Sequence, residues 1–126
     1  AKHMLVVSEY YKFIKAASKN FNIYSIASDI EKATVGIALI YGSYAKGIAE
    51  KDSDIDILII GACKKDRIQA AKNRSPIEIH ALTLNKTSFA TSLMKKENFI
   101  KEVMENHIII KGFEEFTDMR FDYGSD

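Results

Sequence analysis

Two short groups of residues that could do chemistry lie close together in this chain. The stretch LIYGSYAKGIAEKDSDIDILII, residues 39–60, carries Gly42 and Ser43 after one apolar run and Asp54 and Asp56 at the start of the next. A buried charge is costly unless it is paired or bound to a metal. Because side chains alternate along a strand, both carboxylates are expected on one face, where they would repel each other. This placement favours a divalent cation between them.

The Gly42-Ser43 turn offers a complementary chemistry. Glycine lets backbone N–H groups approach a phosphate closely, the serine hydroxyl adds a donor, and Lys46 could bring a positive charge to the same phosphates. Taken singly, Gly-Ser is explained as an ordinary turn and Asp54 as a residue that starts a strand. The order strand, Gly-Ser, Asp-Ile-Asp, strand instead favours one site for a phosphate and a metal ion.

Hydrophobic periodicity predicts the elements that must position these residues. Apolar residues recur at helical spacing from Val6 to Phe21 and, more weakly, from Ile23 to Ala33. Strands are predicted at 37–41, at 54–60 with Gly61 as the stop, at 76–83 with Pro76 as the first residue, and briefly after His107, with one or two helices split near Lys95-Lys96 before the last strand. The pattern predicts the α/β (α+β) class, as a small mixed β-sheet with flanking helices.

Length and composition predict a single domain over residues 1–126. Residues 1–3 are interpreted as an expression-tag remnant, and residues 117–126 as a frayed acidic tail. With 18 Lys and Arg against 17 Asp and Glu, no global field attracts nucleic acid or a membrane, so phosphate binding must be local. No apolar run is long enough to span a membrane, and the single Cys63 fits a reducing cytoplasm.

The segments YGSYAKG and SDIDILII resemble the signature of the DNA polymerase β-type nucleotidyltransferase superfamily. More narrowly, they resemble its minimal nucleotidyltransferases, often called MNT proteins. The resemblance implies a nucleotidyltransferase fold over most of the chain. It implies that Gly42, Ser43 and Lys46 bind the triphosphate of a nucleotide and that Asp54 and Asp56 bind metal. Arginine is commoner than lysine at position 46 in the family, and lysine lacks the bidentate fork.

The family's third carboxylate lies on a later strand, and Glu78 in PIEIHALT is the candidate for that catalytic and metal-binding role. The alternative for Glu78 is an exposed position on an edge strand. His80 shares its face by alternation and could line the cleft, although a histidine without a partner is more often a structural hydrogen-bonding residue. His107 is interpreted as a helix-end residue.

The resemblance also implies a mechanism, a two-metal in-line displacement. Two ions, Mg²⁺ with Mn²⁺ as a substitute, would be held by Asp54, Asp56 and Glu78 while an acceptor hydroxyl attacks the α-phosphate. The implied activity is transfer of a nucleotide monophosphate, AMP from ATP, to a hydroxyl, with a tyrosine of a HEPN-type toxin as the acceptor and an antitoxin role for the protein.

An alternative from a different class remains open. The protein would then be a non-catalytic nucleotide-binding antitoxin or regulatory subunit that acts by masking a partner. Either version is expected to need a protein partner or a homodimer, because the chain has little room for a separate acceptor-binding domain. Extended nucleic acid is not an expected ligand, since the charge is balanced and no aromatic-basic stripe is present.

Overall fold

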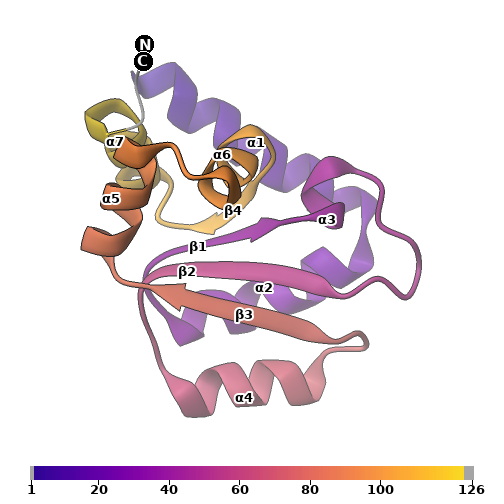
Figure 1. Cartoon of the computed structure of the whole chain (residues 1–126). Coiled ribbons are helices and arrows are strands. Elements are labelled where there is room, and N and C mark those ends of the chain that lie inside the picture. The colour runs from indigo at the N-terminus through magenta and orange to yellow at the C-terminus, as the bar shows by residue number, and fades with distance from the viewer. Residues whose placement is uncertain (1, 124–126) are drawn as a thin grey trace.

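The structure, a computed structural model, describes residues 2–123 of the chain. Figure 1 shows one twisted sheet with helices packed around it. The helices are α1 (Lys2–Lys19), α2 (Phe21–Ala33), α3 (Ser43–Lys46), α4 (Lys65–Arg74), α5 (Lys86–Lys95), α6 (Asn98–Glu105) and α7 (Phe113–Tyr123). The strands are β1 (Thr34–Tyr41), β2 (Ile55–Cys63), β3 (Ile79–Leu84) and β4 (Ile108–Lys111). The predicted fold class, a small mixed sheet with flanking helices, is confirmed.

The four strands lie in the order β3-β2-β1-β4. β1 is antiparallel to both β2 and β4, whereas β2 and β3 are parallel and are joined through α4. A parallel pair needs such a crossover connection, while the antiparallel pairs do not. As a result the end of β1 and the beginnings of β2 and β3 meet at one edge of the sheet. The residues picked out for their chemistry all lie at or next to this edge.

The strands β1, β2 and β4 are largely buried on both faces, because their residues alternate between two apolar clusters, whereas the edge strand β3 is partly exposed. One cluster joins the sheet to α2 and α4 and contains Ile26, Ile30, Ile57, Ile59 and Ala71 among others. The other joins it to α5, α6 and α7 and contains Leu39, Leu58, Phe89, Val103 and Phe116 among others. A sheet covered on both faces explains why its strands are nearly continuous apolar runs.

A pair of facing glycines extends β1 and β2 beyond their predicted limits. Gly36 and Gly61 are register partners, and a Cβ on either would lie 2.4 Å or 2.2 Å from a carbonyl oxygen of the opposite strand. Glycine is therefore needed for the close approach of the two backbones and does not end the strand. The prediction that Gly61 stops the second strand is wrong for this reason.

The C-terminal segment is more ordered than its composition suggests. Residues 117–123 belong to α7, and Thr117 is buried with its hydroxyl donating to the Phe113 carbonyl oxygen at 2.9 Å. The neighbouring Phe116 is almost fully buried in the core. The expectation of a frayed tail from Thr117 is therefore wrong up to residue 123, and residues 124–126 lie outside the described range.

Three smaller features complete the fold. The break between α5 and α6 falls where it was predicted, at Lys96, which takes a left-handed conformation with φ of 54°. At the other end of the chain, Lys2 and His3 are part of α1, and Lys2 forms an ion pair with Asp118 of α7. None of the helices in residues 2–123 has the length and apolar character that a membrane crossing requires.

Candidate functional site

The aspartate pair lies where β2 begins. Asp54 directly precedes the strand and is exposed, and Asp56 is half-buried inside it. Ile55 and Ile57, between and after the aspartates, are fully buried. The alternation that the sequence suggested is therefore present, with the isoleucines in the core and the aspartates on the other side.

The parallel pairing of β2 and β3 brings a second polar pair to the same place. His80 is the register partner of Asp56, and the N–H of Ile55 donates to the carbonyl oxygen of Glu78 at 3.0 Å. Glu78 directly precedes β3, just as Asp54 precedes β2.

The third predicted strand thus begins later than expected, at Ile79 and not at Pro76. Residues 76–77 instead form a bend, which the hydroxyl of Ser75 closes by donating to the Ile77 carbonyl oxygen at 2.6 Å. Proline cannot donate to a strand ladder, so it suits this bend. Because the strand begins later, Glu78 lies just before β3 and is exposed to solvent.

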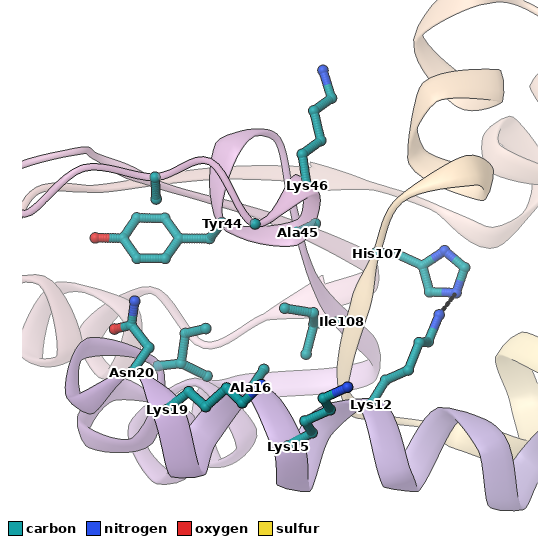
Figure 2. Close-up of a pocket in the computed structure, with 13 residues that line it drawn as sticks. Lys12, Lys15, Ala16, Lys19, Asn20, Tyr44, Ala45, Lys46, His107 and Ile108 are labelled. Carbon is teal, nitrogen blue, oxygen red and sulfur yellow. Dashed lines mark hydrogen bonds between the residues drawn. The ribbon is translucent and has the colours of Figure 1, made fainter.

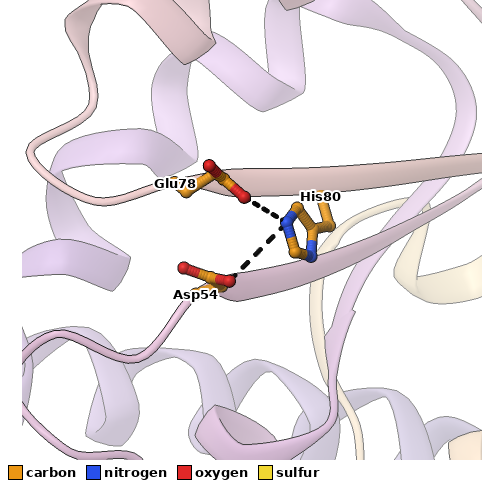
Figure 3. Close-up of side chains that lie close together, drawn as sticks. All are labelled: Asp54, Glu78 and His80. Carbon is orange, nitrogen blue, oxygen red and sulfur yellow. Dashed lines mark hydrogen bonds and ion pairs between the residues drawn. The ribbon is translucent and has the colours of Figure 1, made fainter.

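The side chains of Asp54, Glu78 and His80 converge on one point. Figure 3 shows the two carboxylates flanking the imidazole ring, one from the start of each strand. His80 Nε2 donates to Glu78 Oε2 and lies 3.6 Å from Asp54 Oδ2. One oxygen or nitrogen atom from each of these three residues lies within 4.8 Å of the others. These distances suit three donors around one cation.

The other ring nitrogen of His80 faces the second aspartate. Nδ1 lies 3.5 Å from Asp56 Oδ1, so the ring stands among three carboxylates. The hydrogen bond with Glu78 raises the pKa of His80 above the ordinary value for an imidazole. The charges of Asp54, Glu78 and Asp56 act in the same direction, against the effect of burial.

The Gly42 turn lies directly against Asp56. A Cβ added to Gly42 would lie 2.5 Å from Asp56 Oδ2, and the residue has a φ of +72° that L side chains rarely adopt. Only glycine satisfies both conditions without strain or displacement. The two groups of residues that the sequence separates by a polar loop are therefore adjoining parts of one site.

The loop between them is anchored by Tyr44 of α3. Its buried hydroxyl donates to the carbonyl oxygen of Ser53 at 3.0 Å and accepts a hydrogen bond from Asn22 of α2 at 3.3 Å. Ser53 directly precedes Asp54, so this bond fixes the approach of the chain to β2. A buried hydroxyl with both bonds made holds the loop in one position.

The remaining predicted nucleotide-binding residues lie on α3. Ser43 is its first residue and is half-buried, next to Gly42. Lys46 is its last residue, and its Nζ lies 2.6 Å from Glu102 Oε1 of α6. Figure 2 shows the Lys46 side chain extending away from the lysines of α1. Lys46 thus has a carboxylate partner within the protein, which sequence reasoning did not foresee.

A basic cavity of about 500 Å³ is lined by residues of α1, α3 and the start of β4 (Figure 2). Lysines line it: Lys12, Lys15 and Lys19 from α1, and Lys46 from α3. Lys12 is paired with Glu9 and Lys46 with Glu102, whereas Lys15 and Lys19 have no ion-pair partner in residues 2–123. Two unpaired ammonium groups four residues apart on a helix repel each other, so an anion in this cavity would be stabilised.

A comparison with protein-family models identifies the family. The model for polymerase β nucleotidyltransferases matches residues 19–115. The chain belongs to this nucleotidyltransferase family. The match covers most of the chain and includes Gly42, Asp54, Asp56 and Glu78, and it confirms the superfamily that the two sequence segments indicated. No curated protein matches the sequence.

In this nucleotidyltransferase domain, His80 is the site residue whose importance sequence reasoning underestimated. His80 does make a hydrogen bond, with Glu78, but its ring is half-exposed and stands among three carboxylates. Its spacing of two residues from Glu78 had already placed both side chains on one face of the strand, but the local pattern could not show that Asp54 and Asp56 of β2 would lie beside it.

A second glutamate–histidine pair lies away from these carboxylates, between α1 and β4. Glu9 Oε2 lies 2.8 Å from His107 Nε2, and His107 Nδ1 donates to the Val103 carbonyl oxygen at 2.8 Å. Lys12 Nζ lies 2.6 Å from Glu9 Oε1, as an ion pair without the geometry of a directed hydrogen bond, and Arg120 lies 3.7 Å from Oε2. Both members of this pair are buried, and no local pattern indicated the burial of Glu9.

Proposed function

We propose that this protein is a metal-dependent nucleotidyltransferase that moves a nucleotide monophosphate, AMP from ATP, onto a hydroxyl group. The observation that carries the proposal is the convergence of Asp54, Asp56, Glu78 and His80 beside the Gly42 turn. In a chain that belongs to the nucleotidyltransferase family, this is the place where metal ions and a triphosphate would meet.

The donors at this site fit a divalent cation. Asp54 and Glu78 bring oxygens close together, and Asp56 adds a third carboxylate across the His80 ring. In the proposed enzyme Asp54, Asp56 and Glu78 hold two ions, Mg²⁺ with Mn²⁺ as a substitute. Bound there, such ions supply positive charge for the phosphates and lower the pKa of the acceptor hydroxyl. Three carboxylates with one histidine are otherwise an unfavourable concentration of negative charge on a folded surface.

The protein's own groups orient the reactants. Gly42 has no side chain that would separate the backbone of the turn from Asp56, so a triphosphate could approach both. Ser43 offers a hydroxyl donor next to it. Lys46 would bind the phosphates by exchanging its contact with Glu102, an exposed ion pair of the kind that contributes little stability. The lysines of the neighbouring cavity add a favourable field for an anionic reactant.

The proposed acceptor is a tyrosine of a HEPN-type toxin, which gives the protein the role of a cytoplasmic antitoxin. Apolar side chains exposed on the outer face of α1 support a protein partner or a homodimer: Met4, Val7, Tyr11 and Ile14. They recur at spacings of three and four residues, so they form one stripe along the helix. Large apolar residues gathered on a surface commonly mark an interaction site.

The test is a transfer assay. The protein is incubated with α-labelled ATP, Mg²⁺ or Mn²⁺, and candidate acceptors that include a HEPN-type partner, and incorporated label is measured. Wild type is expected to transfer label, and Asp54→Asn/Asp56→Asn is expected to transfer none while its circular dichroism spectrum stays unchanged. Nucleotide binding without any transfer by wild type would contradict the proposal and favour the non-catalytic antitoxin that masks its partner.

A further inference from the structure

His80 occupies an unusual position for a residue of a carboxylate metal site. Its Nε2 faces Glu78 and Asp54, and its Nδ1 faces Asp56 at 3.5 Å. A ring placed between carboxylates can be a counter-charge, or it can itself be a donor to the ion that the carboxylates hold. The orientation of the two nitrogens distinguishes these roles.

Asp54, Glu78 and His80 each offer one donor atom within 4.8 Å of the other two. Nε2 is the ring nitrogen that faces both Asp54 Oδ2 and Glu78 Oε2. Asp56 is not part of that group. Its Oδ1 faces His80 Nδ1, while its Oδ2, beside Gly42, stays available for the second ion of the proposed function.

In the structure Nε2 carries the proton that it donates to Glu78. For the ring to bind a metal through Nε2, the ion must displace that proton, and the remaining proton must sit on Nδ1. Metal-binding histidines usually donate this second N–H to a carboxylate. Asp56 Oδ1 is the carboxylate oxygen that faces Nδ1, and at 3.5 Å it would accept the bond after an approach of a few tenths of an ångström.

We propose that His80 Nε2 is a ligand of the ion that Asp54 and Glu78 hold, with Asp56 orienting the ring. The proposal rests on the proposed function in one respect, because it concerns the metal site of that function. Its consequence is a choice of metal. Mg²⁺ prefers oxygen donors in a strict octahedron, whereas imidazole nitrogen favours first-row transition-metal ions. The ion that His80 binds is therefore Mn²⁺, Co²⁺ or Zn²⁺ in preference to Mg²⁺, which leaves Mg²⁺ to the other ion of the proposed two-ion site.

The experiment measures metal binding directly and without nucleotide. Mn²⁺ is titrated into the whole protein and the free ion is followed by its electron paramagnetic resonance signal, with Mg²⁺ as the competitor. Pulsed resonance of the bound Mn²⁺ then detects ¹⁴N from a coordinated ring. The variants are His80→Gln and, as a matched control, His3→Gln, which removes a histidine from an exposed position of α1.

Wild type and His3→Gln are expected to show the ¹⁴N coupling, and His80→Gln is expected to lose it. The preference for Mn²⁺ over Mg²⁺ should fall at least about tenfold in His80→Gln, since even removal of an indirect partner of a metal ligand costs about 10- to 100-fold. Because His80 is exposed, the variant is expected to fold, and a two-dimensional NMR spectrum checks this.

Three outcomes would overturn the inference: wild type that binds no Mn²⁺ at millimolar concentration, bound Mn²⁺ without ¹⁴N coupling, or unchanged metal preference in His80→Gln. These outcomes are separable from failure of the proposed function. If wild type transfers label but His80→Gln keeps the metal preference of wild type, the proposed transferase function stands. The proposed role of His80 as a metal ligand is then wrong. A ¹⁴N-coupled Mn²⁺ without any transfer supports the ligand role and removes the transferase.

Discussion

Two glutamate–histidine pairs occur in this protein, and they differ in both burial and charge balance. Glu78 and His80 are exposed, and two further carboxylates, Asp54 and Asp56, stand beside them. Glu9 and His107 are buried, and their neighbours Lys12 and Arg120 are cations. The same pair of side chains thus sits once in an excess of negative charge and once in a cluster with compensating positive charge.

The difference indicates different purposes. A buried charge must be compensated within the protein, because no solvent is present to stabilise it. The carboxylate of Glu9 is compensated by Lys12, His107 and Arg120, and its pair with His107 joins α1 to the residue before β4. An exposed cluster can stay uncompensated because water screens it, and it then has affinity for a cation from solution. The buried pair is accordingly structural, and the exposed pair belongs to the proposed catalytic site.

The largest expected effect is on activity and concerns the exposed pair. Glu78→Gln is expected to lower the transfer rate about a thousandfold, or about 4 kcal/mol of transition-state free energy, because a charged group at the reaction centre is removed. The midpoint of urea unfolding should stay unchanged. Glu105→Gln, an exposed site outside the cluster, is the control. Equal activity of Glu78→Gln and Glu105→Gln in a steady-state assay would show that the exposed pair has no part in catalysis.

The buried pair should show the reverse pattern. Glu9→Gln is expected to lower the free energy of unfolding by about 3 kcal/mol, since it removes the carboxylate that pairs with the buried His107. The turnover number should be unchanged at a temperature where the variant is folded. Urea denaturation at neutral pH measures the stability, and a double-mutant cycle with His107→Asn isolates the pair. A stability loss without coupling to His107 would count against the pair as the cause.

Acid should remove the same stabilisation. Burial by itself would raise the pKa of Glu9, but the hydrogen bond with His107 and the nearby Lys12 lower it below the ordinary value of 4.5. Because the folded-state pKa is the lower one, the contribution is complete above pH 4.5 and is lost as the pH falls through the folded-state pKa. The stability difference between wild type and Glu9→Gln should thus be constant near neutral pH and narrow below 4.5. A difference that persists in acid would contradict this assignment.

Smaller effects on stability and ATP affinity are expected from substitutions at Gly42 and Gly47. Gly42 and Gly47 both have positive φ, at 72° and 75°, but only a Cβ at Gly42 meets a neighbour within 4 Å. Each Ala substitution should cost about 1–2 kcal/mol of stability from backbone strain. Gly42→Ala should in addition weaken ATP binding, because the new methyl displaces Asp56. Calorimetric titration of ATP into both variants tests this, and equal losses of affinity would mean that strain alone is responsible.

The smallest expected effect is a change in the pKa of His80. Its pKa is raised first by the hydrogen bond with Glu78 and then by the surrounding carboxylates, so Glu78→Gln should lower it. NMR titration of the ring resonances in the metal-free protein measures the change. A His80 pKa that is insensitive to Glu78→Gln would show that the exposed pair is not formed in solution.

Much of this architecture could be predicted from local patterns. The apolar run of β2 predicted that Asp54 and Asp56 stand at the start of a strand. The Gly42-Ser43 pair after the preceding apolar run predicted the turn beside them. The expectation for Gly61 was wrong, because a glycine that lets two strands approach looks the same in sequence as one that ends a strand. The frayed tail was wrong up to residue 123, because the burial of Thr117 and the packing of Met119 depend on residues far away in the chain.

The sequence by itself determined the class of fold, the family and the local order of the site residues, since these follow from hydrophobic period and short motifs. Only the tertiary structure decided which polar groups meet. The parallel register of β2 and β3 put His80 beside Asp56, and the docking of α1 brought Glu9 to His107, from 98 positions away. Register and helix docking result from packing of the whole core, so no local pattern encodes them.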